Sequence, residues 1–296
     1  MKLLLQLESI ERSGGDGTVS LPGGGAVDVT SLDKVFFPGH GWTKGDLMRH
    51  YARVAPLLLP RIADRPLVLE RYPDGVEGKS FFQQNAPEDP PPAVRVETIR
   101  GADGEPQRRF VGGDLGTLLH IVQLGTISVD PWNARVGSLD RVDFAILDLD
   151  PGAGASFRDA VAVARLVREE LDRRGLPGEL KTSGKRGLHV HVPLDGGASE
   201  GEALALSREI AEAVVSADPA IATVERSVKD RPKGTIYVDY LQNIVAKPVA
   251  AAWSVRATPD ATVSTPLRWE ELTDDLDPGR FTMETVVGRV EREVRG

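Results

Sequence analysis

Cysteine is absent from the 296 residues, which excludes disulfides, thiolate zinc sites and cysteine nucleophiles. Long apolar runs are also absent, and no stretch approaches the length needed to cross a membrane. The apolar residues 3–5 that follow Met1 and Lys2 form too short a run for a secretory signal. We therefore expect a soluble protein of the cytoplasm, with no membrane partner.

The chain has few basic residues relative to acidic ones: it contains 36 Lys and Arg and 44 Asp and Glu, so its formal net charge is −8. Such a chain is a poor candidate for indiscriminate nucleic-acid binding, so any phosphate contact must come from local basic clusters. Two such clusters exist, at 181–186 and 229–233. A hydrophobic content of 41% is ordinary for a globular core, and the length allows one large domain or two small ones.

Two aspartates close the apolar run 144–147, and they are the most informative feature of the chain. Side chains alternate along a strand, so Asp148 and Asp150 are expected to point to one face, about 7 Å apart. Carboxylates this close repel each other unless a cation lies between them, and Mg²⁺ and Mn²⁺ prefer carboxylate oxygen. The pattern predicts a metal site.

The pentapeptide 148–152 occurs a second time, letter for letter, at 275–279. The motif alone is therefore a weak signal, and its context has to separate the two copies. No apolar run precedes the second copy, which is typical of a solvated turn leading into a short helix. We expect only the first copy to be functional.

From residue 141 onward the hydrophobic pattern is regular and gives the order β-α-β-β-α-β. This is the split β-α-β arrangement, also called ferredoxin-like or RRM-like. Its usual spatial strand order, 4-1-3-2, would place the first strand, and both aspartates, between the third and the fourth. The predicted elements are strand 143–150, a helix between Ser156 as N-cap and Gly175 as C-cap, strands 179–183 and 187–193, helix 199–216 and strand 235–242.

The fold class expected from these patterns is α/β (α+β), with the split sheet packed against an N-terminal α/β lobe. The glycine-rich start is expected to be a short hairpin or an arm. Thr43 is a natural N-cap for a helix that would end at Pro60. The predicted organisation is an arm at 1–27 and one domain at 28–296, divided into an N-terminal lobe at 28–140, with short strands and turns at 66–132, and the catalytic sheet with a C-terminal segment at 141–296.

Two further predicted strands carry polar side chains that this topology would bring to the aspartates. His189 and His191 share one face of strand 187–193, and Asp239 lies inside strand 235–242. Taken singly, a strand histidine is more often a partner of a backbone carbonyl than a ligand, and Asp239 could simply face water. Their convergence on one surface favours a functional site.

The loop 183–187 adds small and basic residues beside the predicted site. Glycines let a backbone approach phosphate, the Ser183 hydroxyl can donate to it, and Lys185 and Arg186 can neutralise it. A tight hairpin turn with exposed charge is the alternative. Beside three carboxylates, a triphosphate cradle is the better interpretation.

These residues, taken in order, resemble the archaeo-eukaryotic primase superfamily. The similarity is greatest to the polymerase (PrimPol) domain of bacterial ligase D and its stand-alone relatives, and it runs from about residue 30 to the end. The primase-polymerase fold is therefore expected. The matching segments are 32–38, 43–47, 81–83, 148–152, 181–184, 187–189, 238–243, 254–256 and 264–267.

The resemblance implies a role for each matching position. Asp148, Asp150 and Asp239 would be the catalytic residues and would hold two divalent ions, Mn²⁺ or Mg²⁺. The residues implied in nucleotide binding are Ser183, Lys185, Arg186, His189, Gln242 and Arg256. Those implied in DNA binding are Arg71, the lysines Lys34 and Lys44 for a 5′-phosphate across a gap, and Phe81 and Phe82 for stacking, although one of these two phenylalanines could equally belong to the core.

The activity implied by the resemblance is a template-dependent DNA/RNA nucleotidyltransferase. It would fill short gaps at DNA ends in non-homologous end joining or excision repair, with a preference for ribonucleotides. The implied partners are gapped or broken DNA with a 5′-phosphate, NTP or dNTP, and Ku and a DNA ligase. The protein is expected to be a monomer located at the nucleoid.

Several positions depart from the family pattern. Asp130 precedes Pro131 and Trp132 where relatives commonly have a histidine, a role that the neighbouring His120 could take over. Arg186 replaces the usual lysine of the nucleotide loop, Ser31 stands near the usual asparagine, and the arginine usually found before Asp239 is displaced around Pro232. These changes concern phosphate affinity and sugar selectivity.

Two other classes of protein compete with the polymerase interpretation. A catalytically inactive nucleic-acid-binding repair module would not need all three aspartates. A two-metal nuclease would need them, but it has little use for the cradle 183–187.

Overall fold

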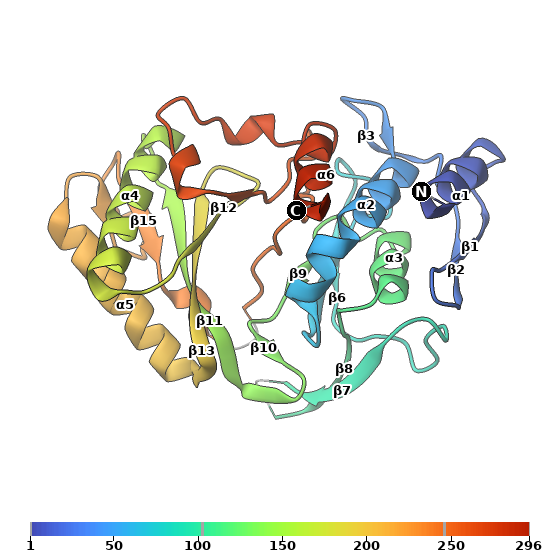
Figure 1. Ribbon diagram of the computed structural model, residues 1–296, viewed down its shortest axis with the longest axis horizontal. Helices are drawn as coiled ribbons and strands as arrows, with labels where there is room; N and C mark the ends of the chain where they lie inside the picture. The colour runs from blue at the N-terminus through green and yellow to red at the C-terminus, as the bar shows by residue number, and fades with distance from the viewer. Residues whose placement is uncertain (1, 102–103, 245–246, 296) are drawn as a thin grey trace.

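A curved sheet forms one half of the protein, shown at left in Figure 1. Its strands lie in the order β14-β15-β11-β13-β12-β16, and β10 pairs with the N-terminal part of β11. The computed structural model describes residues 2–101, 104–244 and 247–295. The strands of this sheet are β10 (Ala134–Arg135), β11 (Ser138–Pro151), β12 (Glu179–Thr182), β13 (Leu188–Ser199), β14 (Ala222–Thr223), β15 (Ile236–Asp239) and β16 (Pro266–Leu267).

The order β15-β11-β13-β12 is the predicted 4-1-3-2 arrangement, so the split β-α-β topology is confirmed. Helices α4 (Phe157–Arg174) and α5 (Glu200–Ala217) cover one face of the sheet (Figure 1). Ser156 and Ser199 each cap a helix in a reciprocal capping box, and Gly175 ends α4 in the left-handed region with φ 66°. These caps define where both helices begin and where α4 ends.

The N-terminal lobe packs around helix α2 (Lys44–Ile62), shown in blue in Figure 1. Thr43 caps α2 as predicted, but the helix runs past Pro60 because its last turn is held by Leu58 and Ile62, which are both fully buried. The lobe's other elements are β3 (Val35–Phe37), β4 (Trp42–Thr43), β5 (Leu67–Arg71), β6 (Phe81–Gln83), β7 (Val96–Arg100), β8 (Pro106–Phe110), α3 (Leu115–Gln123) and β9 (Asp130–Pro131).

The first residues of the chain are more ordered than their glycine content suggests. The expected hairpin is present as β1 (Gly17–Ser20) and β2 (Ala26–Val29), but helix α1 (Lys2–Arg12) precedes it and was not predicted. Leu7 of α1 and Val19 of β1 are fully buried in the same core as α2. This segment is therefore part of the packed lobe.

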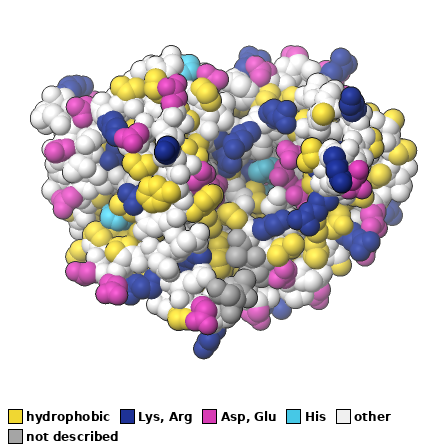
Figure 2. All heavy atoms as spheres, turned by 180° about the vertical axis from the view of Figure 1, so that it is seen from behind, with side chains coloured by type: hydrophobic (Ala, Val, Ile, Leu, Met, Phe, Trp, Pro, Cys, Tyr) yellow, Lys and Arg dark blue, Asp and Glu magenta, His cyan; other side chains and the backbone are white. Residues whose placement is uncertain are grey.

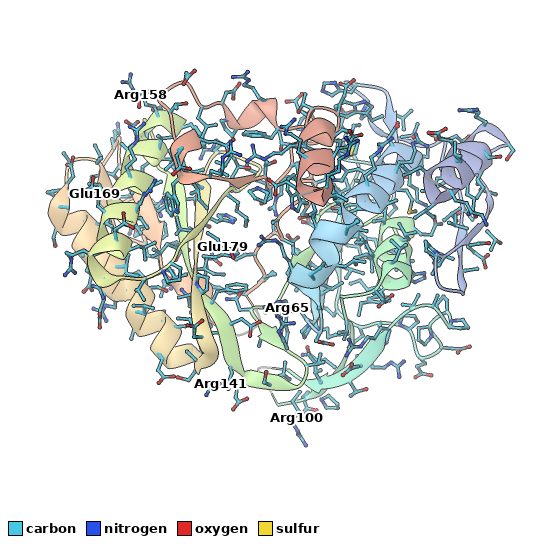
Figure 3. All side chains as sticks on the ribbon, viewed as in Figure 1. Arg65, Arg100, Arg141, Arg158, Glu169 and Glu179 are labelled. Atoms are coloured by element: carbon cyan, nitrogen blue, oxygen red, sulfur yellow. The ribbon has the colours of Figure 1, made fainter. Side chains whose placement is uncertain are left out.

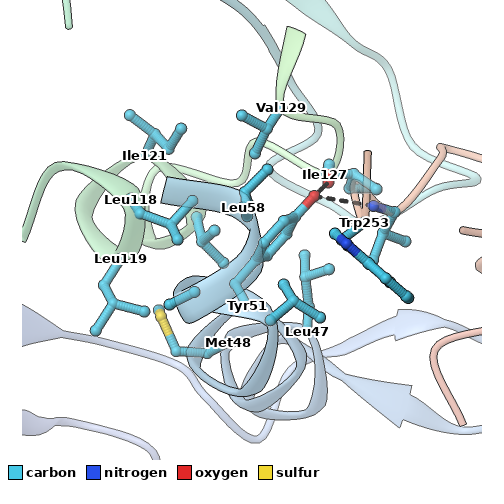
Figure 4. Close-up of a cluster of buried hydrophobic side chains, with 14 of the residues drawn as sticks. Leu47, Met48, Tyr51, Leu58, Leu118, Leu119, Ile121, Ile127, Val129 and Trp253 are labelled. Carbon is cyan, nitrogen blue, oxygen red and sulfur yellow. Dashed lines mark hydrogen bonds between the residues drawn. The ribbon is translucent and has the colours of Figure 1, made fainter. Parts of the chain in front are cut away.

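The C-terminal segment returns from the sheet to the N-terminal lobe. It contains three short 3₁₀ turns and helix α6 (Val287–Arg295), whose Val290 packs into the core around α2. In that core the Tyr51 hydroxyl donates to the Ile127 carbonyl at 2.6 Å and accepts from the Val255 amide at 3.1 Å (Figure 4). The turns are η1 (Leu241–Asn243), η2 (Trp269–Glu271) and η3 (Pro278–Arg280).

Ion pairs also join the two halves. Arg61 of α2 contacts Glu179 of β12 at 2.9 Å, and the buried Arg65 pairs with Asp143 of β11. Figure 3 shows Arg65 and Glu179 on facing sides of the gap between the ribbons. Across the part of the chain that the structure describes, no helix combines the length and hydropathy required to span a membrane.

Candidate active site

Four ionisable side chains form a row across the middle of the sheet. Asp239 of β15 lies opposite Asp148 of β11, which lies opposite His189 of β13. Lys181 of β12 lies opposite His189 and ends the row. Residues opposite one another on antiparallel strands share a face, and Leu147 belongs to the core under α4 and α5, so the row faces away from these helices. The predicted neighbours of Asp148 are confirmed.

Asp150 lies on the same face as Asp148, one row further along, opposite Tyr237. The Tyr237 hydroxyl donates to Asp239 Oδ1 at 3.2 Å. Asp239 also accepts from the Leu241 amide at 2.8 Å and from Gln242 Nε2 at 3.0 Å. The third carboxylate is therefore oriented by its own strand and by the turn η1 that follows it.

The charged forms of Asp148 and Asp150 are disfavoured in this site. Burial raises the pKa of Asp148 to about 6, against the opposing charges of Lys181 and Arg256. Burial, followed by the charge of Asp148, raises the pKa of Asp150 as well. A cation would relieve both effects, because it compensates for lost hydration and separates like charges.

Lys181, His189 and Asp148 lie within short distances of one another across three neighbouring strands. Lys181 Nζ lies 2.6 Å from His189 Nδ1 and donates to Ser264 Oγ at 2.9 Å, and His189 Nε2 lies 3.3 Å from Asp148 Oδ1. Burial, followed by the charge of Arg256, lowers the pKa of Lys181 to about 7. Burial, reinforced by the charge of Lys181, lowers the pKa of His189 well below its usual value, so the ring is neutral. When Nδ1 accepts from the lysine, the ring proton lies on Nε2, the nitrogen nearer to Asp148.

The donor set fits a hard divalent cation, since it consists of three carboxylates with neutral histidine beside them. Within the ranges that the structure describes, no three acidic or histidine side chains are already gathered closely enough to hold an ion. The oxygens of Asp239 are engaged instead by Tyr237 of its own strand and by Gln242 of the turn η1. The three aspartates share a surface without being preassembled around one point.

The loop between β12 and β13 is a tight hairpin at the edge of this row. Ser183 Oγ accepts from the amides of Lys185 at 3.1 Å and Gly187 at 3.0 Å. Lys185 and Arg186 are exposed, and Arg186 donates to the Pro151 carbonyl at 3.3 Å. The hairpin interpretation is thus correct as structure, and it leaves the basic side chains accessible beside Asp150.

Arg256 reaches the same loop from the C-terminal segment. A Cβ added at Gly184 would lie 2.4 Å from Arg256 Cγ, so only glycine allows this approach. Arg256 Nη1 donates to Ser128 Oγ and to Asp130 Oδ1, both at 3.1 Å. Asp130, the position that departs from the family pattern, is therefore the direct partner of a predicted nucleotide-binding residue, whereas His120 of α3 packs on Phe110.

Phe81 and Phe82 both lie on the surface, with 48% and 58% of their areas exposed. The alternative in which one of them belongs to the core is wrong. They occupy β6, an edge strand paired only with β5, whose Arg71 lies over the Phe81 ring at 5.2 Å. Arg71 also donates to the Leu124 carbonyl at 2.7 Å. Both rings are available to stack on bases.

Lys34 lies close enough to Lys44 to influence its charge. Burial and the charge of Lys34 lower the pKa of Lys44 to about 8. Lys44 Nζ donates to the Thr30 carbonyl at 2.9 Å, and Lys34 Nζ donates to Asp74 at 2.7 Å. Figure 2, which shows the protein from behind, has Lys and Arg side chains bordering a hollow between the two halves. A phosphate would compensate for the repulsion between the two lysines.

Two other predicted positions lie apart from the row. His191 is opposite Ile146, and its ring stacks on Phe144 at 4.6 Å, so it does not join the aspartates. In the second copy of the pentapeptide, Asp277 accepts from the Gly279 amide at 2.9 Å and caps the turn η3. The second copy is a solvated turn, as predicted.

Comparisons with known proteins agree with this architecture. Residues 43–295 match the family described as the LigD primase-polymerase domain. The multifunctional non-homologous end joining protein LigD of Mycobacterium bovis is 32% identical over 278 residues, which is 90% of this chain and 36% of that protein. The bifunctional LigD of Bacillus subtilis is 31% identical over 268 residues, covering 90% of this chain and 43% of the relative.

A solved structure matches the fold. The polymerase domain from Mycobacterium tuberculosis ligase D in complex with DNA superposes with a TM-score of 0.83 and 31% identity. The match covers 90% of this chain and 95% of that domain. The chain thus spans nearly a whole polymerase domain but well under half the length of the two LigD proteins above.

Proposed function

The chain belongs to the LigD primase-polymerase domain family, a family of DNA-directed nucleotidyltransferases, and on that premise we propose that it adds nucleotides to DNA ends by template-directed phosphoryl transfer. The observation that carries the proposal is the placement of Asp239 directly opposite Asp148, with Asp150 on the same face. A binding module without turnover has no need for this arrangement.

In the proposed reaction Asp148, Asp150 and Asp239 hold two divalent ions, Mn²⁺ or Mg²⁺. When bound, these ions supply activation of the primer 3′-hydroxyl and stabilisation of the leaving pyrophosphate. The oxygen of that hydroxyl forms a bond to the α-phosphorus, the bond to pyrophosphate breaks, and the hydroxyl proton goes to solvent. His189 is neutral and acts as a hydrogen-bond donor that orients Asp148.

The incoming nucleotide is proposed to lie across the hairpin 183–187. Lys185 and Arg186 are exposed there and would neutralise the triphosphate, and Arg256 closes the opposite side of the cradle. Ser183 and Gln242 would complete the polar contacts. On the DNA side, Phe81 and Phe82 would stack on bases while Arg71 supports the Phe81 ring. A preference for ribonucleotides is part of the proposal.

The biological setting is proposed from the relatives, which are named as non-homologous end joining proteins. We propose that this chain fills short gaps at DNA ends during end joining or excision repair, at the nucleoid. Ku and a DNA ligase are its proposed partners, and a monomer is sufficient because one chain carries all three aspartates.

The proposal is tested with a labelled duplex that contains a short gap, Mn²⁺ and all four nucleotides. We expect the primer to grow by one or a few nucleotides, and a chelator to stop this growth. Shortening of the primer would identify a nuclease, and retention of the duplex without change in either strand would identify a binding module. Comparison of NTP with dNTP tests the sugar preference.

The paired lysines give a second prediction. Replacing both residues, in Lys34→Ala with Lys44→Ala, should abolish the preference for a 5′-phosphorylated gap over a 5′-hydroxyl gap, because the lysines are proposed to bind that phosphate. A matched control removes two positive charges from the far, helix-covered face, in Arg173→Ala with Arg208→Ala. The ratio of affinities for the two duplexes should approach one in the lysine variant only. An unchanged ratio contradicts the assignment.

The same site predicts a pH dependence. The pKa of Lys44 is lowered to about 8, so its ammonium is present below that pH and is lost as the pH rises through it. We expect the preference for the 5′-phosphate to be strongest near pH 7 and to decline by pH 9. The affinity for the 5′-hydroxyl duplex should change much less over this range, which separates the effect from general loss of binding.

A further inference from the structure

Asp130 and Arg256 form an ion pair inside the proposed nucleotide site. Asp130 belongs to β9 of the N-terminal lobe and Arg256 to the C-terminal segment, and each side chain is only 18% exposed. The Ser128 hydroxyl donates to Asp130 at 2.7 Å and accepts from Arg256 at 3.1 Å, so three side chains form a closed cluster. A charge pair at this depth is weakly screened by salt.

The cluster does not satisfy every hydrogen-bond donor of Arg256. Its Nη1 makes both contacts to Ser128 and Asp130, whereas its Nε is buried and meets no partner in the part of the chain that the structure describes. The stem of Arg256 lies against Gly184 of the hairpin 183–187. Arg256 is also close enough to Asp148 to oppose the rise of its pKa. Arg256 therefore contacts the nucleotide loop with its stem, holds Asp130 with its guanidinium and acts on the charge of Asp148.

We propose that Asp130 is a positioning residue that limits the affinity of this site for triphosphate by neutralising Arg256. The inference rests on the proposed function and deepens it. An anionic side chain beside the cradle offsets one of its few cations, and it repels the four negative charges of a metal-free triphosphate more strongly than those of a metal-bound one. Asp130 thus makes the chain select nucleotides that arrive with a divalent cation.

Replacing Asp130 with Asn separates the effect of its negative charge from the effect of its hydrogen bonds. Asn at this position could accept the same hydrogen bonds from Ser128 and Arg256, since only the charge differs. Asp130→Asn should therefore keep the arrangement of the cluster and release the positive charge of Arg256 toward the ligand. Asp130→Ala would remove both the charge and the anchor, so it is a poorer test.

The direct measurement is calorimetric binding of inorganic tripolyphosphate to the whole chain in the presence of a chelator. We expect Asp130→Asn to bind it about five- to tenfold more tightly than the wild type. Asp274→Asn, which breaks an exposed pair with Arg158 and Arg165 outside the site, should leave the affinity unchanged. Equal or weaker binding by Asp130→Asn, or no detectable binding by either protein at millimolar ligand, overturns the proposal.

A double variant shows whether the effect passes through Arg256. Arg256→Gln should weaken tripolyphosphate binding. Adding Asp130→Asn to this variant should not raise the affinity again. A five- to tenfold rise in affinity in the double variant would mean that Asp130 acts independently of Arg256. In the gap-filling assay, where the nucleotide arrives with a divalent cation, Asp130→Asn should lower the nucleotide KM by a smaller factor than it raises the affinity for metal-free tripolyphosphate. Failure of the wild type to extend any primer refutes the proposed function, whereas extension with an unchanged KM refutes only the role of Asp130.

Discussion

Asp148→Asn is expected to reduce nucleotide addition by about three orders of magnitude or more while leaving the affinity for a gapped duplex nearly unchanged. The substitution conserves volume and removes one of the three charges proposed to hold the metal ions. DNA affinity comes mainly from phosphate contacts by Lys and Arg, which this change does not touch. Single-turnover extension with Mn²⁺, together with binding of the same duplex, measures both quantities.

The thermal midpoint of the same variant provides an independent test. The pKa of Asp148 is raised from its usual value of 3.8 to about 6 in the folded state, so its charged form costs stability. That cost grows as the pH rises from the usual value to the folded value, and it is almost fully present at pH 7. Without metal, Asp148→Asn should therefore melt at the same temperature as the wild type or higher. With Mn²⁺ the wild type should gain stability that the variant lacks. A variant that melts far lower without metal contradicts this account.

The chain contains its own control for the aspartate motif. Asp275→Asn with Asp277→Asn alters the second copy of the pentapeptide, which is a solvated turn around η3. Extension by this variant should stay within about twofold of the wild type, because among the described residues no hydrogen bond or ion pair joins Asp275 or Asp277 to the three aspartates of the proposed site. Loss of extension in a folded protein would show that the copy at 275–279 has a function that its geometry does not suggest.

The sequence predicts that the aspartates share one face of the sheet, because this placement depends on regular rules. Alternation along a strand puts Asp148 and Asp150 on one face, and the split topology dictates which strands flank them. The pairing of Asp239 with Asp148 required in addition the register between β11 and β15, which the sequence alone does not specify. Topology was therefore predictable, and the opposing pair became visible only in the structure.

Lys181 was not assigned to the site because its role depends on that same kind of information. A lysine in a short strand usually points to solvent, and only the register of β12 against β13 brings it to His189. The alternation of Lys181 with the buried Leu180 could have indicated the face, although not the partner. The contact between Asp130 and Arg256 joins residues far apart in the chain through packing of the two lobes, and no local pattern reports it.

Alternation did not determine the burial of Phe81 and Phe82. Adjacent strand residues do face opposite sides, but β6 lies at the edge of a small sheet and both of its faces are open, so both rings are exposed. Likewise, the glycines that follow α1 indicate a hairpin or an arm, and the helix before them has no N-cap signal in the sequence. In both cases elements distant in the sequence, and not the local pattern, determine which side chains are buried.

Lys181→Met is expected to lower kcat by about ten- to a hundredfold, the range typical for removal of a residue that orients a metal ligand's partner. Methionine keeps most of the volume but cannot donate to His189 Nδ1, which is 2.6 Å from the lysine nitrogen. The imidazole is then free to place its proton on either nitrogen, and the donor that faces Asp148 is lost in part of the molecules. The nucleotide KM should change much less than kcat, and the Mn²⁺ concentration for half-maximal rate should rise.

A double-mutant cycle with His189→Gln separates positioning from general damage. If Lys181 acts through His189, the double variant should be no slower than His189→Gln alone, because the lysine then has no imidazole to orient. Losses that multiply in the double variant would show that the two residues act independently, for example because Lys181 contacts the nucleotide itself. A wild-type rate in Lys181→Met would show that the chain from Lys181 to Asp148 has no part in the reaction. The expected non-additivity follows from geometry, since Lys181 lies two strands away from Asp148 and His189 stands between them.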